Sequence, residues 1–353
     1  FLMKTPFLSS TLPPAEGQAF PAYAPVWYYY QRYPLSLARY RAALREDIKP
    51  ELKAEIAGSI GLYYLMRGQE KNAEKYFQAS LSYSQKTEVT DEVKFRLLRL
   101  ALKRDQREQA EKLASTLNPE SSAFAGLALA YYQAFTGEKN TTSGRPVMVA
   151  ALKQADICVD GLLDEPVWQS TEAQPVAQVV PGTPGKRSDS SWRVFYNSKG
   201  LCFAFEGRRP GSPIRPAPRQ PKLNSPVWET NCFEVFLDPG CQADYYYELN
   251  IDDSSGVYHG KNRYLISALP DFKPDWQAAA FSSEERFSAE YFLPWSDLGI
   301  NRRPHPGEIW GVNVIRVIVS LEENGRREED YSWSPLRARN FHRVMDQGLL
   351  IFQ

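Results

Sequence analysis

The spacing of hydrophobic positions changes once along this 353-residue chain. From about Tyr23 to Phe135, apolar residues recur every three or four positions, which predicts amphipathic helices. Glycine and proline are sparse after Pro50, and residues with high helix propensity dominate. We therefore predict a helical domain over residues 23–136, which follows an extended N-terminal segment over residues 1–22.

Beyond the helical stretch, the spacing of apolar positions becomes two. A short polar segment rich in Gly, Ser and Thr predicts a linker over residues 137–149. Many short alternating segments with almost no helix then predict an antiparallel β-sandwich or related barrel over residues 150–353. The predicted strands are 191–196, 201–206, 232–237, 245–251, 277–282, 286–292, 309–319 and 349–352.

Small and aromatic residues in the helical stretch are spaced as two antiparallel helices in contact require. Gly61, Tyr64, Ala73 and Phe77 resemble the matching positions of a tetratricopeptide repeat. The resemblance implies a stacked array that presents a groove to a protein partner or to a second copy of the chain. A plain helical bundle is the alternative. Looser copies of the pattern contain Ala38 and Ala42, and then Leu98, Ala101, Ala110 and Ala114.

Charge and cysteine content restrict the function further. Lys plus Arg and Asp plus Glu both number 42, so the net charge is zero, which argues against a nucleic-acid partner. No apolar run approaches the roughly 18 residues of a transmembrane helix. An even number of cysteines in the β-rich half permits one or two disulfides, although buried free thiols are an equal alternative. These cysteines are Cys158, Cys202, Cys232 and Cys241.

Trp228 and Glu234 form the most informative pair for ligand chemistry. In the predicted strand 232–237, Phe233, Val235 and Leu237 share one face. Glu234 lies on the other face, between Cys232 and Phe236. A carboxylate between apolar neighbours needs a partner, water or a ligand, because its desolvation is costly. A tryptophan beside such an acceptor suits a sugar, which offers C–H groups and hydroxyls, but a core tryptophan with a salt-bridged glutamate is the simpler alternative.

Eight segments in order make residues 150–353 resemble the family 9 carbohydrate-binding modules and their wider superfamily of β-sandwich sensor domains. The resemblance implies that Trp228 and Trp333 hold a sugar between their rings, with Glu234 as the hydroxyl acceptor. Asn313 and Arg316 match polar positions of a late strand, but their spacing of three puts them on opposite faces, so at most one serves the site. The segments are 159–168, 194–205, 228–234, 246–250, 289–299, 307–316, 332–335 and 341–352.

The same resemblance implies a structural calcium ion, for which Asp252 and Asp253 are the candidate ligands. We expect a non-catalytic glycan-binding protein outside the cytoplasm, its leader removed, whose helical repeats dock another protein. One alternative is a cell-surface assembly protein whose sandwich has lost sugar binding. Another is a haem-binding module with axial ligands drawn from Met345, His342, His259 or a lysine. No enzyme is expected, because no motif fixes a carboxylate pair, a catalytic triad or a phosphate-binding loop.

Overall fold

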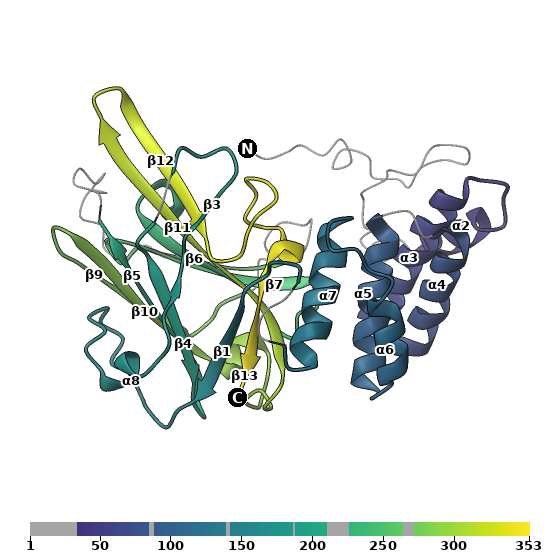
Figure 1. Ribbon diagram of the computed structural model, residues 1–353, viewed down its shortest axis with the longest axis horizontal. Helices are drawn as coiled ribbons and strands as arrows, with labels where there is room; N and C mark the ends of the chain where they lie inside the picture. Colours follow the sequence, from purple (N-terminus) through teal and green to yellow (C-terminus); the bar gives the residue numbers. More distant parts are fainter. Residues whose placement is uncertain (1–33, 85–87, 139–141, 186–187, 210–225, 264–271) are drawn as a thin grey trace. The chain divides into compact units, whose positions relative to one another are not determined.

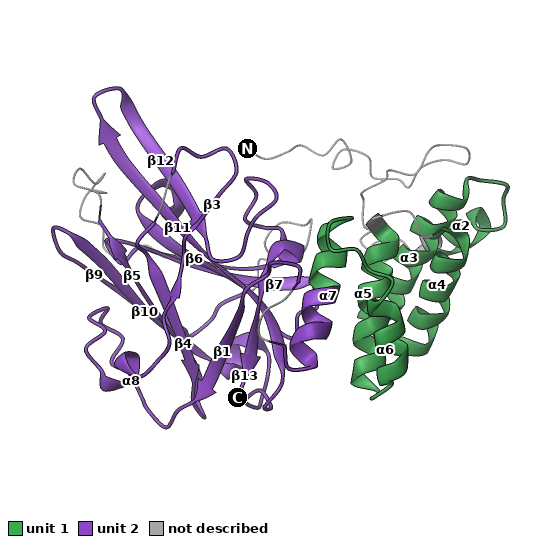
Figure 2. Ribbon diagram, in the orientation of Figure 1, with its two compact units in different colours: residues 1–128 green, residues 129–353 purple. Residues whose placement is uncertain are grey.

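The computed structural model describes residues 34–84, 88–138, 142–185, 188–209, 226–263 and 272–353 (Figure 1). The predicted extended segment 1–22 and the first residues of the predicted helical stretch lie outside these ranges. The chain divides into two compact units, Phe1–Ala128 and Leu129–Gln353 (Figure 2). The division falls inside a helix, so the proposed linker over residues 137–149 stays a prediction.

The first unit is helical, as the spacing of apolar residues predicts. Its helices are α2 (Pro34–Ala43), α3 (Pro50–Met66), α4 (Glu70–Tyr83), α5 (Glu88–Lys103) and α6 (Arg107–Ala114), followed by α7 (Ala123–Phe135), which runs into the second unit. Within the described helices, none is both long and apolar enough to cross a membrane.

The helices α3 and α4 form a hairpin through the small and aromatic positions singled out in the sequence. Phe77 packs directly over Gly61, where a Cβ atom would overlap the aromatic ring. Ala73 is buried beside it, and the Ser80 hydroxyl donates a hydrogen bond of 2.7 Å to the Ala54 carbonyl. The helix contact expected from this spacing is therefore present, whereas the assignment to tetratricopeptide repeats stays a prediction.

The second unit contains all eight predicted strands. The strand order is β8-β7-β6-β11-β13-β1-β4-β5-β10-β9, and β12 pairs with β11. The bounds are β1 (Val147–Leu152), β2 (Gln174–Pro175), β3 (Gln178–Val179), β4 (Ser191–Tyr196), β5 (Gly200–Arg208), β6 (Cys232–Asp238), β7 (Tyr245–Asp252), β8 (Val257–Arg263), β9 (Gln277–Ser282), β10 (Arg286–Pro294), β11 (Ile309–Glu322), β12 (Gly325–Ser332) and β13 (Gly348–Phe352).

Strand β1 joins two halves of the sheet. It pairs in parallel with β13 on one side and with β4 on the other, so the predicted purely antiparallel arrangement is wrong at this strand. We call β8, β7, β6, β11, β13 and β12 the front sheet, and β1, β4, β5, β10 and β9 the back sheet. The back sheet also contacts the front sheet at the far end of the strand order. There the N–H of Ala280 on β9 donates to Oγ of Ser255, in the turn between β7 and β8, at 3.0 Å.

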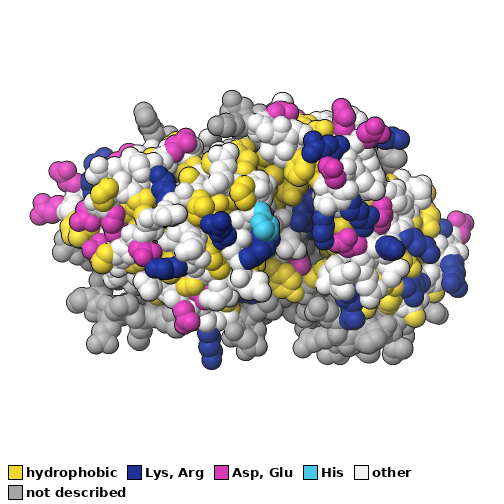
Figure 3. Space-filling view, turned by 90° about the horizontal axis from the view of Figure 1, so that it is seen from below, with side chains coloured by type: hydrophobic (Ala, Val, Ile, Leu, Met, Phe, Trp, Pro, Cys, Tyr) yellow, Lys and Arg dark blue, Asp and Glu magenta, His cyan; other side chains and the backbone are white. Residues whose placement is uncertain are grey.

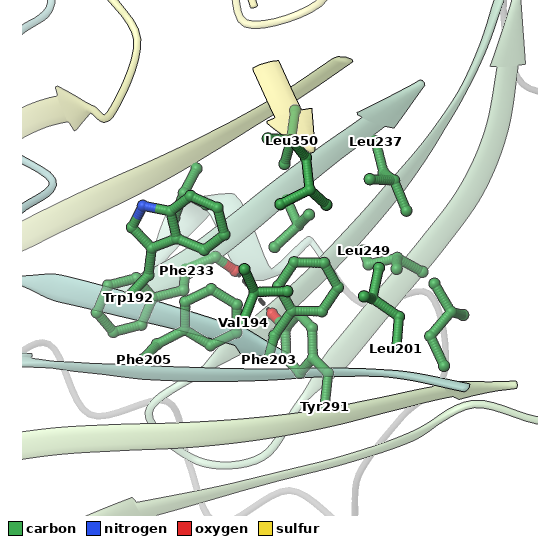
Figure 4. Close-up of a cluster of buried hydrophobic side chains, with 14 of the residues drawn as sticks. Trp192, Val194, Leu201, Phe203, Phe205, Phe233, Leu237, Leu249, Tyr291 and Leu350 are labelled. Atoms are coloured by element: carbon green, nitrogen blue, oxygen red, sulfur yellow. Dashed lines mark hydrogen bonds between the residues drawn. The ribbon is translucent and has the colours of Figure 1, made fainter. Parts of the chain in front are cut away.

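The two sheets face each other across one hydrophobic core, as a sandwich requires. Trp192 and Phe205 come from the back sheet and Phe233 from the front sheet, and the Tyr291 hydroxyl donates to the Phe233 carbonyl at 3.2 Å (Figure 4). Burial of each such side chain contributes about 1.5–3 kcal/mol. The side chains that alternate with these core residues on the front sheet therefore point to its outer face.

A carboxylate fastens the turn at Gly161 to the back sheet. Glu290 on β10 accepts the N–H of Asp160 at 3.1 Å and that of Gly161 at 2.8 Å through Oε2. Its other oxygen accepts the indole N–H of Trp168 at 2.7 Å, from α8 (Pro166–Gln169). This early segment therefore has a structural role.

All four cysteines are free thiols, so the structure contains no disulfide. Cys158 is exposed, while Cys202 lies on the back sheet, Cys232 on the front sheet and Cys241 in the turn after β6. Burial raises the pKa of the Cys202 thiol to about 12, which keeps the thiol protonated. The alternative of buried free thiols holds for three of the four cysteines.

Candidate functional site

The outer face of the front sheet carries polar side chains that are nevertheless buried. Every residue of β6 is buried, with Phe233 and Val235 in the core and Glu234 on the opposite face. The predicted alternation along this strand is therefore confirmed. Glu234 is only 2% exposed, so its carboxyl group lies inside the protein.

Glu234 lies in a row of side chains that crosses the front sheet. It pairs with Asn250 on β7, which in turn pairs with Tyr258 on β8. On its other side it pairs with Ile315 on β11, and Ile315 pairs with Ser332 on β12. Residues paired across neighbouring strands lie on the same face, so these five side chains line one band.

A second carboxyl group lies in the next row. Glu248 on β7 accepts hydrogen bonds from the side-chain amides of Asn250 at 3.1 Å and Asn262 at 2.8 Å. Glu248 is paired with Phe236 on the neighbouring strand β6. The Phe236 ring meets the His342 ring edge to face, with the ring centroids 5.5 Å apart. We call Glu234, Glu248 and Asn250 the acceptor cluster.

The electrostatics of the acceptor cluster favour a proton on one carboxyl group. Burial first, and the neighbouring Glu248 carboxylate second, raise the pKa of Glu234 well above its usual range. From the described residues, Glu234 receives a weak thiol hydrogen bond from Cys232 at 3.5 Å, and this bond lowers its pKa less than burial raises it. A neutral Glu234 carboxyl can donate one hydrogen bond, whereas its ionised form only accepts.

Trp228 lies at the border of this face, in the short helix η1 (Val227–Glu229). Its indole is 43% exposed and meets the Tyr258 ring edge to face, with the ring centroids 5.3 Å apart. Tyr258 belongs to the row of Glu234, so an exposed aromatic surface adjoins the acceptor cluster. The sequence pair Trp228 and Glu234 is thus linked through Tyr258.

Trp333 does not form the second plate of a clamp in this structure. It is 3% exposed and belongs to the core, where it meets Trp192 edge to face at 5.0 Å. Its ring also packs over Gly348, where a Cβ atom would come within 2.5 Å. Trp333 directly follows the last residue of β12, Ser332, and points into the sandwich, so it does not take the position expected of a sugar plate.

Asn313 and Arg316 lie on opposite faces of β11, as their spacing predicts. Asn313 is buried on the outer face, where its Oδ1 accepts the N–H of Ser334 at 2.9 Å and fixes the chain after β12. Arg316 is buried on the core face, with its guanidinium 4.8 Å from the centre of the Phe233 ring. It donates to backbone carbonyls, among them that of Val317 at 2.7 Å, so Arg316 has a structural role.

The two residues proposed as calcium ligands have protein partners. Asp252 accepts the N–H of Ser254 at 2.9 Å and that of Gly256 at 2.8 Å, which closes the turn after β7. Asp253 forms an ion pair with Arg209 at 3.3 Å. Among the described residues, no three His, Cys, Asp or Glu side chains gather as a metal site. A structural calcium ion therefore stays an untested prediction.

The sequence interpretation placed Glu234 in the sugar site but did not assign Glu248 or Asn250 to it. Glu248 and Asn250 alternate with Leu249 and Ile251 on β7, so the period-two pattern that marked Glu234 also marks them. Asn262 and Tyr258 carry no such signal, because β8 mixes polar residues with glycine and was not expected as a strand. The His342 side chain borders the same face, since its Nδ1 is hydrogen-bonded at 2.8 Å to the hydroxyl of Tyr246 on β7.

Fold and site together define a chain with a helical unit and a sandwich-like β unit whose front sheet carries buried acceptors beside an exposed indole. No protein-family model matches the chain. It is 26% identical over 195 residues to endo-1,4-beta-xylanase A of Thermotoga neapolitana, and 24% identical over 188 residues to the enzyme of that name from Thermotoga maritima. Each alignment covers 53% of this chain but spans only 16% of the length of the relative.

Two solved structures are similar to the β unit. One is a family 9 carbohydrate-binding module of Caldicellulosiruptor kristjanssonii in complex with cellotriose, with a TM-score of 0.44 and 11% identity over 59% of this chain and 93% of that chain. The other is a family 9 module of the same organism in complex with glucose, with a TM-score of 0.43 and 11% identity over 58% of this chain and 95% of that chain. The family assignment stays the resemblance stated from the sequence.

Proposed function

We propose that this chain is a non-catalytic carbohydrate-binding protein that holds its ligand at the outer face of the front sheet. The observation that carries the proposal is the exposed Trp228 indole beside the acceptor cluster. A sugar needs an aromatic surface for its C–H groups and acceptors for its hydroxyls, and this face provides both. The partial similarity to two xylanases adds support, because such enzymes act on a polysaccharide.

In this proposal Trp228 is a single plate, and Tyr258 supports it from the side. Glu234 and Glu248 accept hydroxyl hydrogen bonds. A single plate gives weak affinity, so the proposed docking of a protein partner by the helical unit would supply attachment and raise the useful binding. A location outside the cytoplasm belongs to the same proposal.

Replacement of Trp228 by alanine tests the plate. Loss of one stacked aromatic side chain removes about 1.5–3 kcal/mol of burial energy, so glycan affinity should fall by roughly tenfold or more. Phe281→Ala is the matched control, because Phe281 is a similarly exposed aromatic on β9 of the back sheet. Binding would be screened on a glycan array and measured by titration calorimetry. Equal affinity in the wild type and Trp228→Ala would refute the role of Trp228.

The non-catalytic part of the proposal has its own measurement. Incubation of the chain with xylan and cellulose should release no new reducing ends, because glycoside hydrolysis needs carboxyl groups on both sides of the scissile bond, whereas Glu234 and Glu248 lie on one face of the front sheet. Steady release of reducing ends that disappears in Glu234→Gln would overturn it.

A cell-surface assembly protein is the second candidate, and the burial of Trp333 favours it. Without a second plate, the front sheet lacks the two-sided clamp that the family resemblance implies. Charged side chains of both signs and hydrophobic side chains are mixed over one face of the molecule, which suits protein contacts better than nucleic acid (Figure 3). A folded protein that binds no glycan but self-associates in light scattering would support this candidate.

A further inference from the structure

We propose that the acceptor cluster selects a sugar with a protonated amino group over a neutral or an acidic sugar. The ligand class is an amino sugar, such as a glucosamine oligomer. This inference rests on the proposed carbohydrate-binding function and names the substrate class of the same site.

The band around Glu234 contains more hydrogen-bond acceptors than the described residues satisfy. Asn250 is fully buried, and its side-chain oxygen has no hydrogen-bond partner among the described residues. Its amide nitrogen donates to Glu248, which fixes the orientation of the amide and turns the oxygen away from Glu248. The Ser332 hydroxyl, in the row of Glu234, is also buried and has no hydrogen-bond partner in the part of the chain that the structure describes. An unpaired buried polar group is energetically costly. A ligand that donates hydrogen bonds to the Asn250 oxygen and the Ser332 hydroxyl would remove this cost.

Within the described part of the chain, no lysine or arginine compensates the charge of the acceptor cluster. There, no Lys or Arg side chain forms an ion pair with Glu234 or Glu248. The His342 ring is a basic group close to Glu248, with its Nδ1 4.0 Å from Glu248 Oε2, and this nitrogen is already hydrogen-bonded to the Tyr246 hydroxyl. The described residues also offer no group of three metal-binding side chains. A cation supplied by a ligand therefore fits this charge pattern better than a metal ion.

An ammonium group suits this band better than a hydroxyl or a carboxylate. An ammonium group brings three N–H donors and a positive charge, whereas a hydroxyl brings one donor and no charge. Hydrogen bonds between charged partners are roughly twice as strong as neutral ones. A uronic acid would bring its own carboxylate beside the Glu248 carboxylate and would be repelled. The nearby Trp228 and Tyr258 rings favour a cation as well, through their negative faces.

The front sheet leaves a position without a side chain beside Glu248. Gly260 on β8 is the partner of Glu248 across the strands. A Cβ atom at Gly260 would meet the Tyr258 hydroxyl at 3.1 Å and the Asn262 amide at 3.4 Å. Glu248 is buried, and its partner position on β8 carries no side chain, so the Tyr258 hydroxyl and the Asn262 amide are the polar groups beside it on that strand.

Binding of the amine should displace a proton. Burial and the Glu248 carboxylate raise the pKa of Glu234, which favours the protonated form of this group in the free protein. An ammonium ion bound beside it stabilises the ionised carboxyl group, so the proton of Glu234 passes to the buffer. Titration calorimetry in buffers of different ionisation enthalpy measures this release.

The test titrates the full chain with four oligomers of equal length at one ionic strength: glucosamine, N-acetylglucosamine, glucose and galacturonate. The glucosamine oligomer should bind at least tenfold tighter than the glucose oligomer, with proton release. Acetylation of the amine, or a pH above the pKa of the amine, should abolish the advantage. Glu234→Gln should abolish both the advantage and the proton release. The control Glu322→Gln, at a half-exposed carboxylate on β11, should keep both.

Each other outcome decides the matter. Equal binding of the glucosamine and glucose oligomers, both lost in Trp228→Ala, overturns the amine inference and leaves the proposed function intact. Binding of no oligomer by the folded protein overturns both. A glucosamine advantage that survives Glu234→Gln shows attraction to general surface charge and also overturns the inference. If Glu234→Gln fails to fold, Glu248→Gln replaces it and should lose the same advantage.

Discussion

Alanine in place of Gly161 should destabilise the β unit more than any glycine replacement in open space. Gly161 has φ of +85°, and a Cβ atom there would lie 2.6 Å from the backbone nitrogen of Phe281 and 2.7 Å from the carbonyl carbon of Ala280. The left-handed backbone costs an alanine about 1–2 kcal/mol. Overlap with the backbone of β9, which cannot rotate away, adds about 1–3 kcal/mol. The free energy of unfolding should therefore fall by about 2–5 kcal/mol.

Gly182 separates the two costs. Its φ of +84° is nearly the same, but nothing lies within 4 Å of a Cβ atom there, so Gly182→Ala should cost only the conformational part. Urea unfolding followed by tryptophan fluorescence reports on the β unit, because all tryptophans except Trp27 lie within residues 168–333. Equal losses in the two variants would refute the close approach of Gly161 to β9.

Two further predictions concern Glu290 and Phe77. Burial raises the pKa of Glu290 from 4.5 to about 7, although the N–H donors of Gly161 and Trp168 oppose the shift. The folded state thus binds this proton more tightly than the unfolded chain, and the free energy of unfolding should fall as pH rises from about 4.5 through about 7. Urea unfolding at stepped pH should show a smaller fall in Glu290→Gln, and an unchanged slope would contradict the assignment. Phe77→Ala should destabilise the helical unit by about 3–5 kcal/mol, measured from the helical circular dichroism signal, because the ring fills the gap over Gly61. A loss below about 1 kcal/mol would contradict that packing.

The elements with a strong hydrophobic period could be predicted from the sequence, and those without one could not. Strand β6 alternates between Phe233, Val235 and Leu237 on the core face and an outer face that holds Glu234 and Asp238. Strand β12 reads Gly-Arg-Arg-Glu-Glu-Asp-Tyr-Ser, which has no apolar face until Tyr331, and it forms because β11 supplies the hydrogen-bonding edge. The parallel pairing of β1 depends on contacts with strands that are distant in sequence, so local pattern cannot reveal it.

The candidate site shows the same limit from another direction. Residue type identifies Trp228 and Trp333 equally well as sugar plates, but only one strand position of difference decides which face a side chain takes. Trp333 directly follows Ser332, which lies on the outer face, and so Trp333 points into the core. Trp228 precedes its strand in a short helix and remains exposed. The register of the strand therefore decides which face an aromatic residue takes when it continues the alternation of that strand, as Trp333 does. An aromatic residue in a separate short helix, such as Trp228, can face a ligand whatever the register.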